Sequence, residues 1–360
     1  MQVGSKKGGG EDGDDAAEEE AGESAGQSGA NPKAAFVRAK SKVLQKLSTQ
    51  HLVSHTLPVV ISLKHTLEAT KSSLQVHIFH VKEKNPEILF YSCFGFKYLK
   101  YTCKRVLFLG ENIRPDLTAC DLAFSYDYNS SKRHFRLPLY SLYIEHHNML
   151  DKLNRKLSRE EAEQIWKSKS KFCCMVVSNP DCKERIEFYH NVSKIKQVDS
   201  GGRYLNNVGG PVPDKFEFIK DYKFVLSFEN GIHDGYTTEK VLEPMFMHCI
   251  PIYWGNKLVH KDFNKNRFVN YFDFKYEEQV IQKMLEIDSN DELGIQMTME
   301  QPFNTQKVTY EEELQLVLKT LTRLIESTKT PIAQTFWSYV HRLKLKIPYF
   351  KKIAYSKISK

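Results

Sequence analysis

The sequence lacks several features that would place it in a class at once. No run of about 18 or more apolar residues occurs, so no membrane-spanning helix is expected. The chain does not begin with a charged segment followed by an apolar one, so no secretory signal is visible. The seven cysteines include no C-x-x-C pair. This spacing argues against a zinc site and favours buried free thiols.

Basic residues are scarce only at the start of the chain. Residues 1–30 hold eight acidic residues and two lysines, a net charge of −6, whereas the whole chain carries +8. This acidic, glycine-rich segment has few apolar residues and is expected to be a disordered tail. The remaining residues carry +14, which suits phosphate-bearing ligands, nucleic acid or an anionic membrane surface.

Strand-like segments fall into two groups, and the 360 residues are enough for two medium domains. Short apolar runs bounded by turn or charged residues predict strands at 58–63, 75–81, 88–93 and 105–110, and again at 172–179, 221–228 and 249–255. A short helix is expected around 65–73, and later helices at 276–288 and 309–327. Strands that alternate with helices in this way predict two α/β domains with mostly parallel sheets.

Capping signals predict where two helices begin. Ser158 and Glu161 have the spacing of a capping box, inside the polar segment 150–171 that we interpret as an interdomain connection. Asn179 is predicted to cap a helix that has Pro180 at its first position.

Ligands of parallel sheets bind at the carboxyl ends of the strands, which directs attention to the loops after Gly110, Asn179 and Phe228. The last loop belongs to SFENGIHDGYTTEK, residues 227–240, which leaves a strand and enters a helix near Thr238. The helix N-terminus favours an anion, so Lys240 in the first turn suits a bound phosphate. A plain glycine loop with a solvated lysine is the alternative.

Two other residues could carry chemistry. Arg185 lies early in a predicted helix, where its guanidinium could bind phosphate oxygens or form surface salt bridges. Glu111 follows a strand and a glycine, where a carboxylate could accept a proton or simply lie at the surface. The glycine-rich stretch 199–215 matches neither common phosphate-binding glycine motif and is interpreted as a mobile loop that could wrap a nucleotide.

These segments together resemble the α-1,3/1,4-fucosyltransferases of glycosyltransferase family 10, in their bacterial-type soluble form. The resemblance rests on YKFVLSFEN, GYTTEKV and CIPIYWG in 222–255, on VVSNPDCKERIEFY and FVNYFDF, and on LFYSCFG, GENIRPD and RLPLY in the first half. It covers about residues 85–325. It implies a GT-B type fold, α/β, with two Rossmann-like domains facing a cleft. The parts implied are a disordered tail 1–45, an acceptor-binding domain 51–160, a GDP-fucose-binding domain 166–328 and a basic amphipathic tail 329–360.

The resemblance also implies roles for individual residues. Arg185 and Lys240 resemble the pair that neutralises the donor diphosphate, and Glu111 resembles the proposed general base. Asn230, Tyr236 and Glu239 resemble residues that line the sugar nucleotide. The implied reaction is inverting transfer of fucose from GDP-β-L-fucose to a glycan hydroxyl, O3 of N-acetylglucosamine, with no metal site and no required cofactor. A divalent metal would at most stimulate it.

Other functions remain open from the sequence. They are an inverting transferase that uses another sugar nucleotide, and a nucleotide-sugar or glycan-binding protein without catalysis. Nucleic-acid binding has no supporting motif and is not expected. Pro244 falls inside the helix after Thr238, where it removes a hydrogen bond to the carbonyl of Lys240 and is expected to kink the helix.

The C-terminal residues and the compartment complete the expectations. Residues 341–360 carry seven Lys or Arg and no acid, interleaved with apolar residues, and could contact a membrane surface peripherally or form a solvated tail. The family resemblance suggests the Golgi membrane or lumen for a eukaryotic protein, and the cytoplasm or inner-membrane surface for a bacterial one.

Overall fold

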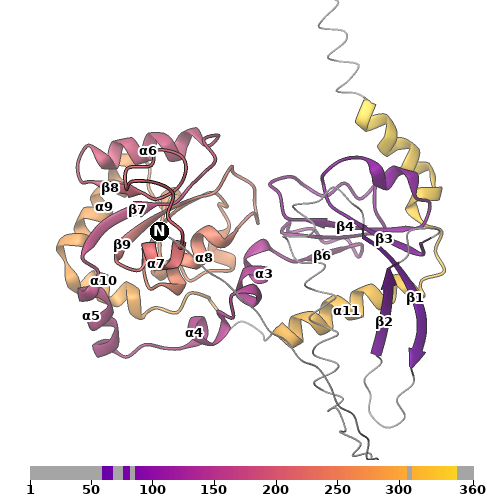
Figure 1. The fold of residues 1–360 in the computed structure, drawn as a ribbon, viewed down its shortest axis with the longest axis horizontal. Coiled ribbons are helices and arrows are strands. Elements are labelled where there is room, and N and C mark those ends of the chain that lie inside the picture. Colours follow the sequence, from indigo (N-terminus) through magenta and orange to yellow (C-terminus); the bar gives the residue numbers. More distant parts are fainter. Residues whose placement is uncertain (1–58, 68–75, 82–85, 306–309, 347–360) are drawn as a thin grey trace, which may run out of the picture. The chain divides into compact units, whose positions relative to one another are not determined.

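The computed structural model describes residues 59–67, 76–81, 86–305 and 310–346, all within one compact unit, residues 45–360. The predicted disordered tail and residues 347–360 lie outside these ranges. The described residues form two sheets (Figure 1). Each sheet has its own hydrophobic core. No helix in these ranges combines the length and the apolar composition needed to cross a bilayer.

The first sheet has six strands in the order β2-β1-β3-β4-β5-β6. These strands are β1 (Val59–Leu67), β2 (Val76–Val81), β3 (Ile88–Tyr91), β4 (Lys104–Leu109), β5 (Leu122–Ser125) and β6 (His134–Arg136). Strands β3 to β6 are parallel, which agrees with the predicted mostly parallel sheet, although β5 and β6 were not among the predicted strands. Strand β1 runs antiparallel to both neighbours. The expected helix at 65–73 is wrong over 65–67, which belong to β1, and its remainder lies outside the described residues.

The second sheet is parallel throughout, in the order β11-β10-β9-β7-β8. Its strands are β7 (Lys171–Met175), β8 (Val198–Ser200), β9 (Tyr222–Phe228), β10 (Ile250–Trp254) and β11 (Val269–Asn270). The buried residues of β9 alternate between two cores, with Phe224 and Leu226 on one face and Val225 on the other. Burial of both faces explains the continuous apolar runs in the sequence.

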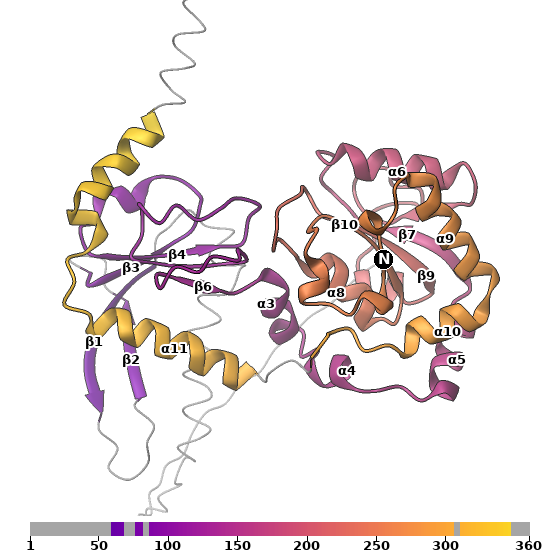
Figure 2. The same ribbon diagram turned by 180° about the vertical axis from the view of Figure 1, so that it is seen from behind.

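Helices cover both faces of the second sheet (Figure 2). The helices are α3 (Leu139–His146), α4 (Leu150–Asn154), α5 (Arg159–Ser168), α6 (Lys183–Ser193), α7 (Lys215–Ile219), α8 (Glu239–Phe246), α9 (Glu277–Ser289), α10 (Asp291–Met299) and α11 (Tyr310–Glu326). The predicted capping box is confirmed, because the Ser158 hydroxyl accepts from the Glu161 N–H and the Glu161 carboxylate accepts from the Ser158 N–H. The predicted helices at 276–288 and 309–327 correspond to α9 and α11.

Helix α11 packs on the first sheet, whereas the segment 166–328 had been expected to form one domain (Figures 1 and 2). Val317 and Leu321 share a core with Phe90 and Phe108 of β3 and β4. The Lys104 ammonium, at the start of β4, donates to the carbonyls of Leu324 and Ile325 and so caps the end of α11. The chain therefore returns to the first sheet after completing the second.

Candidate active site

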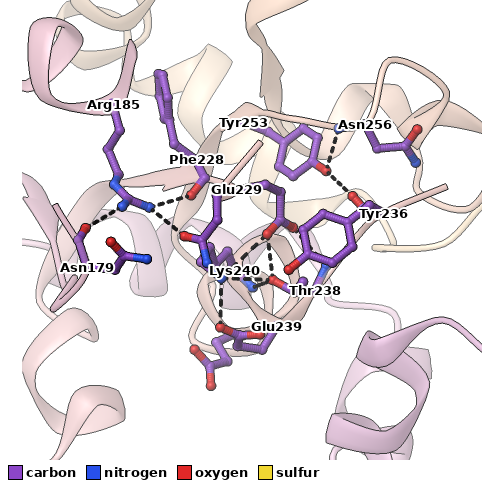
Figure 3. A network of polar contacts seen from close by, with 12 residues as sticks. Asn179, Arg185, Phe228, Glu229, Tyr236, Thr238, Glu239, Lys240, Tyr253 and Asn256 are labelled. Atoms are coloured by element: carbon purple, nitrogen blue, oxygen red, sulfur yellow. Dashed lines mark hydrogen bonds and ion pairs between the residues drawn. The ribbon is translucent and has the colours of Figure 1, made fainter. Parts of the chain in front are cut away.

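The 229–238 loop, which connects β9 to α8, is built around one buried carboxylate. Glu229 is fully buried, and its side chain accepts hydrogen bonds from the backbone N–H and the hydroxyl of Thr238, each at 2.8 Å. The Thr238 hydroxyl in turn accepts from the N–H of Lys240 and caps α8 (Figure 3). The predicted helix start near Thr238 is confirmed. Glu229 and Thr238 thus fix the first turn of α8.

Two glycines at positive φ allow this loop to close. Gly255 has a φ of 153°, and a Cβ at this position would lie 2.5 Å from Cγ of Glu229. Gly235, at φ 89°, would place a Cβ 2.5 Å from the carbonyl oxygen of Tyr126. Its N–H donates to the side chain of the buried Asn256 at 2.8 Å. Other residues would be strained at both positions.

Lys240 lies in the first turn of α8 between two carboxylates. Its Nζ is 3.1 Å from Oε1 of Glu239 and 3.5 Å from Oε2 of Glu229. Burial disfavours the ammonium, but these carboxylates outweigh burial and raise the pKa of Lys240. Burial likewise opposes the charge of Glu239, but Lys240 and Lys215 outweigh it and lower the pKa of Glu239 to about 2. Both groups are therefore charged at neutral pH.

Pro244 lies inside α8, yet the helix runs without interruption from Glu239 to Phe246. Proline has no N–H to donate to the carbonyl of Lys240. Lys240 nevertheless stays within reach of Glu229 and Glu239.

Arg185 is buried beside this loop and binds oxygen atoms of three residues. Its Nη1 donates to the carbonyl of Phe228 at 3.2 Å and to Oδ1 of Asn230 at 3.3 Å. Its Nη2 donates to the carbonyl of Asn179 at 2.6 Å (Figure 3). The Nε group is buried and has no hydrogen-bond partner within the described part of the chain. Among the described residues no carboxylate lies within ion-pair distance of Arg185, so its charge is not neutralised by direct pairing.

The predicted cap of α6 is wrong. The helix begins at Lys183 with Cys182 as N-cap, three residues later than a start at Pro180. The side chain of Asn179 instead accepts from the N–H of Asp181 at 2.8 Å, and its carbonyl is bound by Arg185. Local turn chemistry at Asn179 therefore competes with helix capping.

The two remaining donor-site candidates lie on the 229–238 loop. Asn230 is exposed, with Oδ1 bound to Arg185. Tyr236 is 3% exposed, and its ring packs edge-on against Tyr126, with 5.1 Å between centroids. Tyr126 directly follows β5 of the first sheet, so side chains from both sheets meet here. The sequence did not reveal Tyr126, because the pairing spans more than a hundred residues.

Glu111 lies after β4 and Gly110 and is partly buried. Its carboxylate makes no hydrogen bond or ion pair with any residue that the structure describes. Its negative charge helps to raise the pKa values of Tyr236 and Cys93, in both cases after the larger effect of burial. Glu111 therefore lies within electrostatic range of the 229–238 loop.

The 199–215 stretch is stabilised by hydrogen bonds from one of its own side chains. The Nδ2 of Asn206 donates to the carbonyls of Gly202 and Gly210, each at 2.8 Å. At its end Lys215 pairs with Glu243 of α8. Within the described ranges, no group of three or more His, Cys, Asp or Glu residues is arranged to hold a metal ion.

Two family models match the parts of the chain that contain the two sheets. The model for glycosyltransferase family 10 (fucosyltransferase), C-terminal part, matches residues 166–311. The model for the N-terminal domain of the α-(1,3)-fucosyltransferase FucT matches residues 61–143. A third model, for HEAT repeats of a condensin-2 subunit, matches residues 1–83. HEAT repeats are helical, whereas the described residues of that range, 59–67 and 76–81, form strands.

Curated relatives and solved structures agree with the first two models. The α-(1,3)-fucosyltransferase FucT of Helicobacter pylori is 34% identical over 236 residues, 58% of this chain and 49% of that protein. The GDP-fucose protein O-fucosyltransferase 3 of Homo sapiens is 26% identical over 175 residues, 45% of this chain and 36% of that protein. The chain thus spans about half or less of these relatives. A crystal structure of an α1,3-fucosyltransferase with GDP-fucose superposes with a TM-score of 0.58 at 28% identity, covering 69% of this chain and 80% of that one. The fold is therefore α/β of the GT-B type.

Proposed function

We propose that this chain, which is similar to glycosyltransferase family 10 over residues 166–311, transfers L-fucose from GDP-β-L-fucose to a hydroxyl of a glycan, O3 of N-acetylglucosamine, with inversion to an α-1,3 linkage. The observation that carries the proposal is the state of Arg185. Its buried guanidinium has no carboxylate partner, and its Nε has no acceptor, among the residues that the structure describes; this is a costly arrangement unless an anion completes it.

The donor diphosphate is the anion that fits this place. Arg185 and Asn230 lie at one side of the 229–238 loop, and Lys240 lies at the N-terminus of α8. Helix N-termini and guanidinium groups both bind phosphate oxygens. Lys240 would exchange its contact with Glu239 for the diphosphate, while the hydrogen bonds between Glu229 and Thr238 would still hold the loop. Charge development on the leaving group would then be stabilised by groups already in place.

Glu111 supplies the base in this mechanism. The acceptor hydroxyl gives its proton to the Glu111 carboxylate while its oxygen forms a bond to C1 of fucose. The bond from C1 to the β-phosphate oxygen breaks, and its electron pair leaves with GDP. One displacement inverts the β-linked donor to an α-linked product. Among the described residues, none is hydrogen-bonded to the Glu111 carboxylate, so its oxygens are available for the acceptor hydroxyl.

Product mapping tests the function. The chain is incubated with GDP-fucose and N-acetyllactosamine, and the product is analysed by mass and by nuclear magnetic resonance of the new linkage. We expect an α-1,3-fucosylated product, formed equally well with EDTA, because the proposed charge stabilisation uses Arg185, Lys240 and the helix N-terminus. GDP-mannose should not serve as donor. Transfer only to protein hydroxyls, or binding of GDP-fucose without transfer, would contradict the proposal.

We also propose a peripheral membrane contact through residues 341–360, together with the helical segment 336–346, which overlaps the start of that range. Large apolar side chains are exposed on this segment, namely Phe336, Trp337, Tyr339 and Leu343. The buried His341 anchors this segment to the connections that flank β4, because it is hydrogen-bonded to Tyr98 at 2.6 Å and to Asp116 at 3.1 Å. Basic residues follow directly, and this combination suits an anionic interface.

Vesicle binding tests this contact. The chain should sediment with vesicles containing phosphatidylserine and not with phosphatidylcholine alone. Replacing Trp337 with Ser should weaken binding by about tenfold, the equivalent of roughly 1.4 kcal/mol. The matched control is Leu316→Ser, because Leu316 is an equally exposed apolar residue on α11. Equal loss in both variants, or no binding by the unaltered chain, would contradict the contact.

A further inference from the structure

The turn that carries Glu111 is joined to the 229–238 loop by residues that have no part in the mechanism above. Asn112, the next residue after Glu111, hydrogen-bonds through Oδ1 to Nδ1 of His233. Because a carbonyl oxygen only accepts, Nδ1 of His233 carries the proton. The bond therefore links the loop after β4 of the first sheet to the loop after β9 of the second.

Two further contacts support the same junction. A Cβ on Gly231 would lie 2.5 Å from Nδ2 of Asn112, so the Asn112 amide packs directly on the 229–238 backbone. The Tyr126 hydroxyl donates to the carbonyl of Ile113 at 2.8 Å, and the Tyr126 ring stacks on His233 with centroids 6.5 Å apart. The turn after Glu111 is thus held at Asn112 and at Ile113.

We propose that Asn112 and His233 are positioning residues that set the Glu111 carboxylate against the donor loop. The inference rests on the proposed transfer reaction. That reaction requires one acceptor hydroxyl to meet a base from the first sheet and a fucose held by the second. The proposed reaction assigns neither residue a bond to the reacting atoms. A misplacement of about 1 Å can reduce the rate about 100-fold, so a direct bond between the two loops has a large effect.

The test uses Asn112→Ala, His233→Ala and the double variant, with GDP-fucose and N-acetyllactosamine as substrates. Each single variant should lower kcat roughly 10- to 100-fold while KM for GDP-fucose changes little. The double variant should be no slower than the slower single variant, because both changes break one bond. His233→Asn should recover much of the rate, since its Nδ2 can replace the Nδ1 donor of histidine.

The matched control is His260→Ala, which removes an exposed imidazole with no hydrogen bond to any residue the structure describes. Its kcat should be unchanged. Both Asn112 and His233 are only partly buried, so their substitution is not expected to unfold the chain, and melting temperatures check this. Three results would overturn the inference without affecting the proposed function. They are an unchanged kcat in either Ala variant, fully multiplicative losses of kcat in the double variant, and no recovery of kcat in His233→Asn. Absence of transfer by the unaltered chain would overturn the proposed function and the inference with it.

Discussion

Replacing Glu111 with Gln is expected to lower kcat by roughly 10²- to 10⁴-fold, the range for loss of a general base. Glutamine keeps the shape of the side chain but cannot accept the acceptor proton at neutral pH. Binding of GDP should persist, because the residues proposed to hold the diphosphate, Arg185 and Lys240, lie on α6 and α8, which pack on the second sheet. The Glu111 carboxylate has no hydrogen-bond partner among the described residues, so stability should also be retained.

Steady-state kinetics and calorimetric titration with GDP measure these two effects separately. Glu87→Gln is the matched control, because Glu87 is an exposed carboxylate just before β3 and has no role in the mechanism. Full activity of the Glu111 variant would remove this residue from catalysis. A parallel loss of GDP binding would instead assign Glu111 to the donor site.

The second large effect is expected from Lys240→Met. Removing this ammonium should lower kcat about 10²- to 10³-fold, as for other groups that stabilise charge in the transition state, and should weaken GDP binding. The variant also removes the ammonium that pairs with both Glu229 and Glu239, so the repulsion between these carboxylates should lower the melting temperature. The double variant Lys240→Met with Glu239→Gln should recover stability but not activity.

This separation of stability from activity is the decisive feature of the Lys240 test. Lys183→Met is the matched control, because Lys183 lies at the start of α6 with 82% of its side chain exposed. It should change neither rate nor melting temperature appreciably. If the double variant regained activity together with stability, Lys240 would be a structural partner of Glu239 rather than a ligand of the diphosphate.

Local sequence signals were sufficient to predict several features of the helices that pack on the two sheets. The Thr238 cap, the capping box at Ser158 and the amphipathic helix α11 each depend on residues within a few positions of one another. Asn179 failed as a helix cap, because its backbone and side chain were taken by Arg185 and Asp181. Competing local hydrogen bonds of this kind are not visible in a spacing pattern.

Long-range pairing accounts for most of what the sequence did not predict. The apolar face of α11 was predicted, but the spacing of its apolar residues does not show whether the helix packs on the first sheet or on the second. The antiparallel direction of β1 also depends on its partners rather than on its own residues. At the site, the chemistry of the residues alone did not decide whether Arg185, Lys240 and Glu111 act on a ligand or lie at the surface. The family resemblance, not the spacing, connected them.

The central claim is that Arg185 and Lys240 together hold the donor diphosphate, and a crystal structure with bound GDP tests it most directly. We predict that Nε of Arg185, which has no partner in the present structure, lies within hydrogen-bond distance of a phosphate oxygen. Nζ of Lys240 should contact the diphosphate rather than Glu239. A GDP molecule whose phosphates contact neither residue would contradict the account.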